Sequence, residues 1–164
     1  MRSYAINPDT GGPGRWRGGC GLIREVEVLA PEAMVSMRID TVENPPWGVA
    51  GGHAAGSGRC VVNPGRTDER ILKPLSDGNI VFRGDVVRVE TGGGGGWGHP
   101  FDREPERVLA DVQTGFVSRA KAEEDYGVVL TRDIEVDAAA TRERRSARPV
   151  AKLFHRHGYQ DVLD

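Results

Sequence analysis

The sequence lacks the features that mark several large classes of protein. It has only two cysteines, Cys20 and Cys60, in 164 residues, too few for a disulfide-rich scaffold. Its apolar runs are short, as at residues 128–130, so no segment has the length of a transmembrane helix, and residues 1–10 lack the apolar stretch of a secretion signal. The formal net charge of −2 leaves no basic excess for nucleic-acid phosphates. These absences predict a cytoplasmic protein that binds neither nucleic acid nor membrane.

Glycine, in contrast, is abundant. The chain contains 23 glycines, roughly twice the ~7% share of an average protein. They are concentrated in residues 11–21, 48–58 and 92–98. Segments with clear strand patterns separate these clusters, so the sequence is not simple low complexity. The clusters predict three places where the backbone adopts conformations or approaches that other residues do not allow.

Alternation of apolar and polar residues predicts strands in the first two-thirds of the chain. Residues 22–29 alternate valine with glutamate, and residues 35–39 alternate apolar with polar side chains. We expect these two strands to form a hairpin across the turn between them. Residues 1–20 have no periodicity and predict an extended, turn-rich arm. Further short strands are expected at residues 60–62, 71–72, 80–83 and 86–90, with a long loop at residues 43–58.

After the last glycine cluster the period changes from 2 to 3.6, which predicts helices. The first lies between Pro105 and Gly115, the second between an N-cap at Ser118 and a stop at Gly127, and the third from about Asp137 to Arg145. The acidic residues near the start of the first helix complement its dipole and are expected to be structural: Asp102, Glu104 and Glu106. The fold class is α+β, with a β-rich first two-thirds and a small C-terminal helical segment.

The run of five glycines at residues 92–96 does not fit a phosphate-binding loop. Such a loop needs a lysine and a serine or threonine directly after the glycines, whereas Trp97 and Gly98 follow here. A dinucleotide fingerprint needs a βαβ unit, which the element order does not supply. A plain linker is disfavoured because Trp97 and the pair Pro100–Phe101 follow at once. The run therefore predicts a close approach of backbone to another surface, either a ligand or another polypeptide.

Four stretches in sequence order resemble one protein family. They are GGPGRWRGGCGLIRE at residues 11–25, PPWGVAGGHAAGSG at 45–58, GDVVRVETGGGGGWGHPFDREPERVLADVQTGFVS at 84–118 and AEEDYGVVL at 122–130. Together they are similar to the C-terminal region of the hydantoinase B/oxoprolinase family, which also includes subunits of acetone and acetophenone carboxylases. The resemblance implies one domain over residues 1–130, which is incomplete without partner subunits, and a helical or irregular tail over residues 131–164.

The resemblance also implies partners and chemistry. Family members pair with an ATP-using hydantoinase A-like subunit and open cyclic amides such as hydantoins or 5-oxoproline, while the related carboxylases act on ketones. ATP and a divalent metal are therefore expected in partner subunits and no cofactor in this chain. The family's metal-linked N-terminal region is absent from this sequence, which is either a separate small subunit or a fragment. The family's Gly-Asp-Pro after the glycine run is replaced by Gly98-His99-Pro100.

Two histidines are the candidate catalytic residues. His99 is a potential general acid–base or metal ligand, because imidazole titrates near neutrality, and the alternative is that it packs or hydrogen-bonds beside Trp97. His53 lies among small residues that give access to the backbone. Cys20, His53, Cys60 and His99 are ligand types that zinc prefers, but they lack the close spacing of zinc sites. His155 and His157 are expected in a solvated tail rather than in a metal site, so no metal ligand is assigned.

Arg15 and Arg17 flank Trp16 and point to the same side if the segment is extended. They are expected to bind a carboxylate or phosphate or to pair with acids of a partner subunit, although ordinary surface arginines are the alternative. Trp47 is expected to anchor its loop. The predicted substrate-binding or partner-binding set is Arg15, Arg17, Trp47, Gly51, Gly52, Gly93, Gly94, Gly95 and Trp97.

The leading hypothesis is a small subunit that completes the hydantoinase B-like component of an ATP-dependent enzyme for cyclic-amide hydrolysis. Its partners would be larger hydantoinase A-like and hydantoinase B-like subunits. The first alternative is a subunit of a ketone carboxylase, and the second is a non-catalytic scaffold of such a complex.

Overall fold

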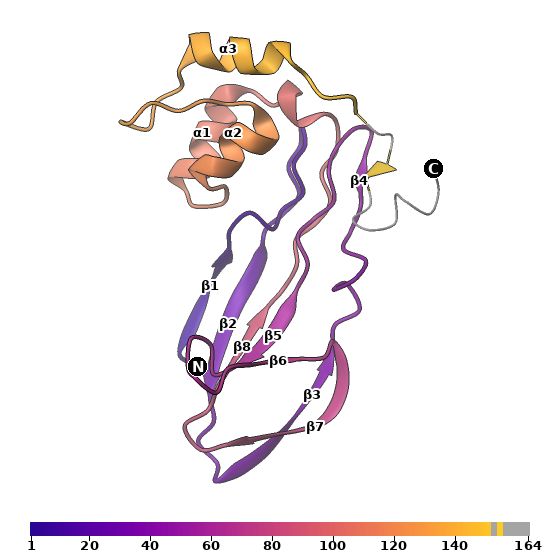
Figure 1. The fold of residues 1–164 in the computed structure, drawn as a ribbon, viewed down its shortest axis with the longest axis vertical. Helices are drawn as coiled ribbons and strands as arrows, with labels where there is room; N and C mark the ends of the chain where they lie inside the picture. Colours follow the sequence, from indigo (N-terminus) through magenta and orange to yellow (C-terminus); the bar gives the residue numbers. More distant parts are fainter. Residues whose placement is uncertain (152–153, 156–164) are drawn as a thin grey trace.

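The computed structural model describes residues 1–151 and 154–155. Strands dominate the first two-thirds, and the α-helices follow toward the C-terminal part (Figure 1). The predicted α+β class is therefore confirmed. Among the described residues, no helix combines the length and the apolar character that a bilayer crossing requires.

The largest sheet has five antiparallel strands in the order β1-β2-β8-β5-β6. Their bounds are Ser3–Asn7 for β1, Gly21–Glu27 for β2, Val86–Glu90 for β8, Arg59–Val62 for β5 and Arg70–Leu72 for β6. Residues 1–20, predicted as an extended, turn-rich arm, contain β1, whose residues pair with β2 along their full length. Tyr4, Ala5 and Ile6 are all exposed, so no alternation of buried and exposed side chains marks this strand in the sequence.

The prediction that residues 22–29 and 35–39 form a hairpin is wrong. The second strand, β3 (Glu32–Arg38), pairs with β7 (Leu75–Phe82), whereas β2 pairs with β1 and β8. The pair β2–β8 continues into the pair β3–β7, so that together they form one bent two-stranded ribbon. At the bend, Val28 N–H donates to Asp85 O at 2.9 Å. Alternation predicts a strand but not its partner, and here the paired residues lie between 37 (Arg38 and Leu75) and 67 (Ile23 and Glu90) positions apart.

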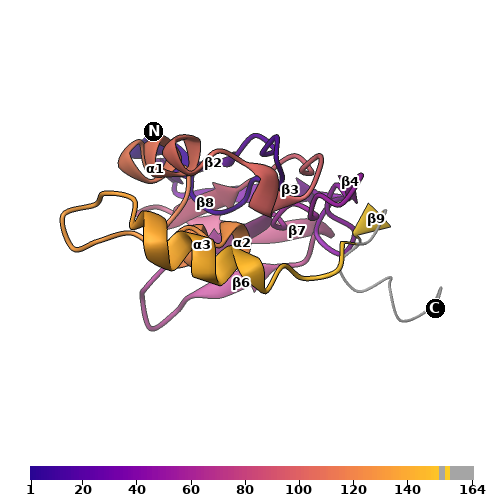
Figure 2. The ribbon, with the colours of Figure 1, turned by 90° about the horizontal axis from the view of Figure 1, so that it is seen from above.

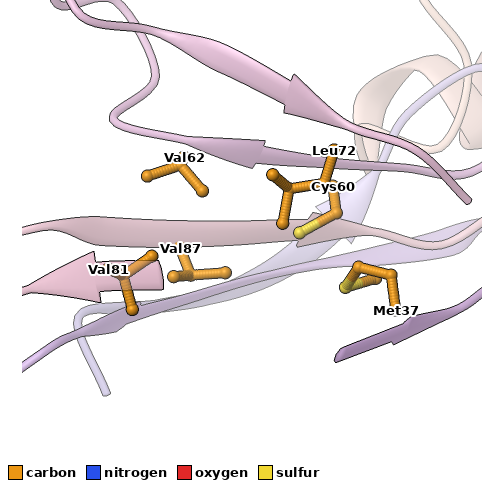
Figure 3. Packing of buried hydrophobic residues seen from close by; sticks show 6 residues of the cluster. All are labelled: Met37, Cys60, Val62, Leu72, Val81 and Val87. Atoms are coloured by element: carbon orange, nitrogen blue, oxygen red, sulfur yellow. The ribbon is translucent and has the colours of Figure 1, made fainter. Parts of the chain in front are cut away.

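The bend brings β3 and β7 against one face of the five-stranded sheet, where they enclose the first apolar core. Its buried side chains are Met37, Cys60, Val62, Leu72, Val81 and Val87 (Figure 3). Burial raises the pKa of the Cys60 thiol, so this cysteine behaves as a small apolar side chain.

The helices form as predicted and cover one end of the sheet (Figures 1 and 2). They are the short 3₁₀-helix η1 (Pro100–Asp102), α1 (Pro105–Gln113), α2 (Arg119–Tyr126) and α3 (Ala138–Ser146). Ser118 caps α2 by accepting the N–H of Lys121, and Gly127 ends it with φ 62°. A second apolar core lies among the helices and the segments that follow α1 and α2. Its buried side chains are Val108, Val117, Ala122, Tyr126, Val128 and Leu130.

Helix α3 lies in the segment predicted as a tail, and Asp137 caps it as expected. Val129 N–H donates to Thr141 Oγ1 at 3.0 Å, and Arg145 Nε donates to Tyr126 O at 3.1 Å. These bonds tie α3 to the residues at the end of α2 and just after it. The domain boundary after residue 130 stays a prediction.

The Asp125 carboxyl group in α2 makes stability depend on pH. Burial raises the pKa of Asp125 to about 6. Lys121 lowers this pKa in part, and Glu124 and Asp9 raise it slightly. Because the ordinary value is 3.8, the folded chain binds this proton more tightly than the unfolded chain, and stability falls as the pH rises from about 4 to about 6. Asp125→Asn should therefore be more stable than the wild type at pH 7.5, by on the order of 1–2 kcal/mol after allowance for partial exposure.

Urea denaturation of both proteins between pH 4 and pH 8 measures this effect. The stability gain of Asp125→Asn should shrink toward pH 4, where the wild-type carboxyl group is protonated in the folded chain. A gain that is the same at every pH would show that desolvation of the charge is not its cause.

Candidate functional site

The three glycine clusters, residues 11–21, 48–58 and 92–98, converge between the sheet and the helices, and we call their assembly the glycine core. Backbone N–H to C=O bonds of 2.7–2.9 Å join each pair of clusters: Gly12 to Gly94, His53 to Pro13, and Gly96 to His53. Trp97 forms an antiparallel bridge to Trp16 and a parallel bridge to Val49. The three clusters thus form a small ladder of backbone hydrogen bonds in which most residues have no side chain.

Only glycine fits at the closest approaches in this core. A Cβ at Gly18 would lie 1.8 Å from Gly94 O, and one at Gly95 would lie 1.9 Å from Trp47 O. The predicted close approach is therefore confirmed. The surface approached is the chain's own backbone, however, and not the ligand or second polypeptide that the sequence suggested, because the three clusters satisfy one another's hydrogen bonds.

The other predicted glycines also face this core. A Cβ at Gly52 would lie 2.3 Å from Gly96 O and one at Gly93 2.1 Å from Thr10 O, while one at Gly94 would meet no atom closer than 3.6 Å. Gly51 has φ +92° and lies against Ala151. Their predicted role in binding a substrate or partner stays a prediction.

Most backbone N–H groups of residues 92–98 donate to carbonyls within the chain. Those of Gly93, Gly94, Gly96, Trp97 and Gly98 donate to the carbonyls of Gly56, Gly19, His53, Trp16 and Val49, respectively. A phosphate loop must direct such groups at its ligand. The glycine run therefore does not fit a nucleotide, and the absence of a lysine after it agrees with this geometry.

His99 is buried at the start of η1, where both ring nitrogens have partners. Nδ1 accepts the N–H of Phe101 at 3.0 Å, and Nε2 lies 3.1 Å from Pro149 O. Because Nδ1 accepts and a carbonyl oxygen can only accept, this pair of contacts requires the tautomer whose hydrogen is on Nε2. These contacts give His99 a capping role, and to act as an acid–base it would have to give up one of them. Its predicted role in catalysis stays a prediction.

His53 is half-buried in the glycine core. Its backbone donates to Pro13 O and accepts from Gly96 N–H, so the residue links all three clusters through its main chain. Cys60 lies in the apolar core of the sheet and Cys20 beside Arg17. Within the described part of the chain, no three histidine, cysteine or acidic side chains are grouped so as to hold a metal ion. His155 belongs to the short strand β9 (Phe154–His155), which pairs with β4 (Gly48–Val49), and His157 lies outside the described residues.

Arg17 takes part in a buried ion cluster that the sequence did not reveal. Asp111 Oδ1 lies 3.3 Å from Arg17 Nη2, and Asp111 Oδ2 lies 2.8 Å from Arg103 Nη2. Arg17 also stacks on the ring of Phe116, 4.9 Å from its centroid. Arg17 thus has an acidic partner within its own chain, and its predicted role in binding a substrate or a partner subunit stays a prediction. One signal pointed to Asp111, because it stands one helical turn after the buried Val108, on the inner side of α1.

Arg15 remains exposed beside a small pocket of about 130 Å³. The pocket is lined by Arg15, Trp16, Asp102, Arg103, Glu104 and Arg107. Asp102 is held by Arg148, whose hydrogen bond at 2.6 Å lowers the pKa of this carboxyl group. Glu104 is the N-cap residue of α1, and Glu106 lies in its first turn. The predicted structural role of these acids agrees with their positions.

Three tryptophans flank the glycine core, and we call them the tryptophan rim: Trp16, Trp47 and Trp97. Each is about half exposed, at 51%, 52% and 51%, respectively. Trp16 and Trp97 are directly opposite each other in an antiparallel bridge, so their side chains lie on the same side of the ladder. Half-exposed aromatic side chains on a rigid backbone are typical of binding surfaces.

The comparisons with known proteins agree with this architecture. The family model for hydantoinase B/oxoprolinase matches residues 1–100. The chain is 36% identical over 88% of its length to a protein of Pseudomonas sp. (strain NS671) that is named as the B component of a D-/L-hydantoinase, of which it covers 24%. It is 28% identical over 86% of its length to the acetone carboxylase alpha subunit of Xanthobacter autotrophicus (strain ATCC BAA-1158 / Py2), of which it covers 23%.

The crystal structure of the ATP-dependent caprolactamase from Pseudomonas jessenii has a similar fold. The TM-score is 0.78 with 31% sequence identity, over 90% of this chain and 26% of that chain. The chain thus spans about a quarter of the length of these relatives. By the family match and by these similarities, the chain belongs to the hydantoinase B/oxoprolinase family.

Proposed function

We propose that this chain completes the hydantoinase B-like component of an ATP-dependent, multi-subunit enzyme that hydrolyses cyclic amides. The main support is the likeness to the ATP-dependent caprolactamase, which extends over 90% of the chain at 31% identity and a TM-score of 0.78. The reaction class adds one water across a ring amide and yields an open-chain amino acid. ATP and a divalent metal would be bound by larger hydantoinase A-like and hydantoinase B-like subunits.

Within such an enzyme the glycine core is a rigid support rather than a set of reacting groups. Among the described residues, the buried charges of Arg17, Arg103 and Asp111 pair with one another, and both ring nitrogens of His99 have partners. The tryptophan rim and Arg15 remain accessible at the edge of this support. We expect these side chains to face the larger subunits and to border the site where the lactam is opened.

Reconstitution tests this function. The chain is mixed with the larger hydantoinase A-like and hydantoinase B-like subunits, the assembly is weighed by native mass spectrometry, and lactam opening is followed with ATP. We expect a stable complex whose turnover requires all its components. A chain that stays alone, or larger subunits that work equally well without it, would refute the proposal.

A ketone carboxylase is the second candidate, supported by the 28% identity to the acetone carboxylase alpha subunit. The same complex would then join bicarbonate to a ketone at the expense of ATP. Assays with acetone or acetophenone plus bicarbonate, run beside the lactam assays, decide between the two reactions.

His99→Asn separates a scaffold from a catalytic role for this residue. The asparagine side chain can still accept the N–H of Phe101, as an N-cap does. If His99 only caps η1, the variant should assemble normally and keep turnover within about twofold, whereas His99→Ala should lose about 0.5–2 kcal/mol of stability. If the imidazole transfers a proton, both variants should assemble but lose turnover by about 100-fold or more.

A further inference from the structure

One face of the five-stranded sheet is covered over only part of its width. On the side of β5, β6 and β8, this face packs against β3 and β7 and forms the apolar core. The rest of the same face belongs to β1 and β2, at the edge away from β6. In the sheet register, Ile6 is opposite Leu22, Tyr4 is opposite Arg24, and Arg24 is opposite Val89 of the core side. These side chains therefore lie on the same face as the core. We call those of β1 and β2 the apolar half-face: Tyr4, Ile6, Leu22, Arg24 and Val26.

The apolar half-face is exposed and hollowed. Tyr4 is 61% exposed, Ile6 38% and Val26 37%. An open cavity of about 340 Å³ is lined by Tyr4, Leu22, Arg24, Val26, Val89 and Thr91. A second cavity, of about 780 Å³, shares Val89 and Thr91 with it and continues along β3. The two cavities adjoin at Val89 and Thr91 and form a mainly apolar groove across the sheet, with Arg38 and Asp40 in the lining of the second cavity.

The opposite face of the five-stranded sheet has a different character. Arg88 pairs with Glu25 at 2.6 Å, and Arg59 pairs with Glu90 at 2.6 Å. Charged pairs of this kind are typical of the solvated face of an antiparallel sheet. The contrast indicates that the apolar half-face is not built for contact with water.

Among the residues that line the first cavity, Arg24 alone is charged. It lies in the lining of the first cavity, directly between Tyr4 and Val89 in the register, and it has no ion-pair partner among residues 1–151. An occupant that buries Tyr4 and Val26 would also desolvate Arg24, which is unfavourable unless the occupant supplies an acid. The first cavity thus fits an amphipathic segment with an apolar stripe and one carboxylate.

We infer that the occupant is a segment of the larger hydantoinase B-like polypeptide of the same enzyme. The hydantoinase and caprolactamase relatives are about four times as long as the part that this chain matches, since the chain covers only 24–26% of their length. The other three quarters of such a polypeptide are the natural source of a segment that covers the sheet. This inference rests on the proposed function, because it names the surface through which that assembly forms.

The test compares two neighbouring residues of β1. Tyr4→Asp places a charge on the apolar half-face, and Ala5→Asp places the same charge one residue later, on the opposite face. Both side chains are exposed, so both variants should fold, which thermal melts of each chain check. Binding of each chain to the larger hydantoinase B-like subunit is then measured by titration. We expect at least about a 30-fold loss of affinity for Tyr4→Asp, as for an interface hot spot, and less than about a twofold loss for Ala5→Asp.

Arg24→Glu is the second variant, and it should weaken binding by at least about tenfold, because it would face the proposed carboxylate of the partner. Wild-type binding by Tyr4→Asp, or equal losses for Tyr4→Asp and Ala5→Asp, would overturn the inference. Concentration-dependent dimers that Tyr4→Asp abolishes would also overturn it, since a second copy would then be the occupant. If the wild-type chain assembles and supports turnover but Tyr4→Asp does so too, the docking inference alone fails. If the wild-type chain does not assemble, the proposed function fails as well.

Discussion

Asp111→Ala is expected to destabilise the chain by about 3–5 kcal/mol, because it removes the anion that two buried arginines share. The side chains of Arg17, Asp111 and Arg103 are only 14%, 10% and 10% exposed, respectively. Asp111 accepts from both Nε and Nη2 of Arg103, at 3.1 and 2.8 Å, and from Arg17 at 3.3 Å. Without the carboxylate, two guanidinium groups would stay buried next to each other without compensation. Such a loss is a large fraction of the stability of a typical domain.

Urea denaturation followed by circular dichroism measures this loss, on the chain or on its complex. Asp77→Ala is the matched control. It breaks an arginine–aspartate pair of the same 2.8 Å length, with Arg38, but the two side chains are 62% and 65% exposed. Because water solvates both partners there, the control should leave the denaturation midpoint nearly unchanged. Equal effects of the two substitutions would mean that burial does not set the importance of the Asp111 cluster.

Gly18→Ala is expected to disrupt the glycine core, since its Cβ would lie 1.8 Å from Gly94 O. The obstacle is a backbone carbonyl in a hydrogen-bonded ladder, so it cannot move aside as a flexible side chain can. Relief requires separation of two glycine clusters and loss of the bonds between them. We expect a penalty at or above the upper end of the usual range of about 1–3 kcal/mol for overpacking. The change should also abolish assembly with the larger subunits if the tryptophan rim depends on this ladder.

The neighbouring residue provides the control. A Cβ at Gly19 would meet no atom within 4 Å, although Gly19 O takes part in the same ladder by accepting from Gly94 N–H at 2.9 Å. Gly19→Ala should therefore be neutral, or stabilising by about 0.4–1 kcal/mol through lower entropy of the unfolded chain. Thermal melts of both variants and native mass spectrometry of their complexes test the pair. If Gly18→Ala melts like Gly19→Ala, the clusters are not packed as closely as described.

Short-range signals predicted the helical part well. Ser118, Gly127 and Asp137 stand at helix ends and act within one turn of the residues they cap, so their effect is visible in sequence. The strand segments were also recognisable from alternation. Their pairing was not, because β2 and β3 are adjacent in sequence but bind partners in the 75–90 segment. The choice between a local hairpin and the long-range ribbon depends on which arrangement buries the apolar face, and that requires the complete fold.

For the candidate site, too, the sequence predicted some features and the structure alone showed others. The glycine clusters alone predicted a close approach of backbone, and the motifs around them predicted the family to which the chain belongs. They did not indicate that the clusters approach one another, nor that Arg17 and Arg103 share Asp111. Contacts between residues 94 positions apart, as from Arg17 to Asp111, leave no periodicity in the chain.

By itself, the sequence thus determined the family, the α+β class, the helix ends and the three glycine clusters in which the backbone approaches another surface closely. These properties depend on residue type and on near neighbours, so the order of the amino acids is sufficient to read them. Only the tertiary structure decided which strands pair, that both nitrogens of His99 are engaged, that Asp111 holds two buried arginines, and that β1 and β2 present an uncovered apolar face. These properties depend on burial, which is set by segments far apart in the chain and becomes visible only when they are packed together.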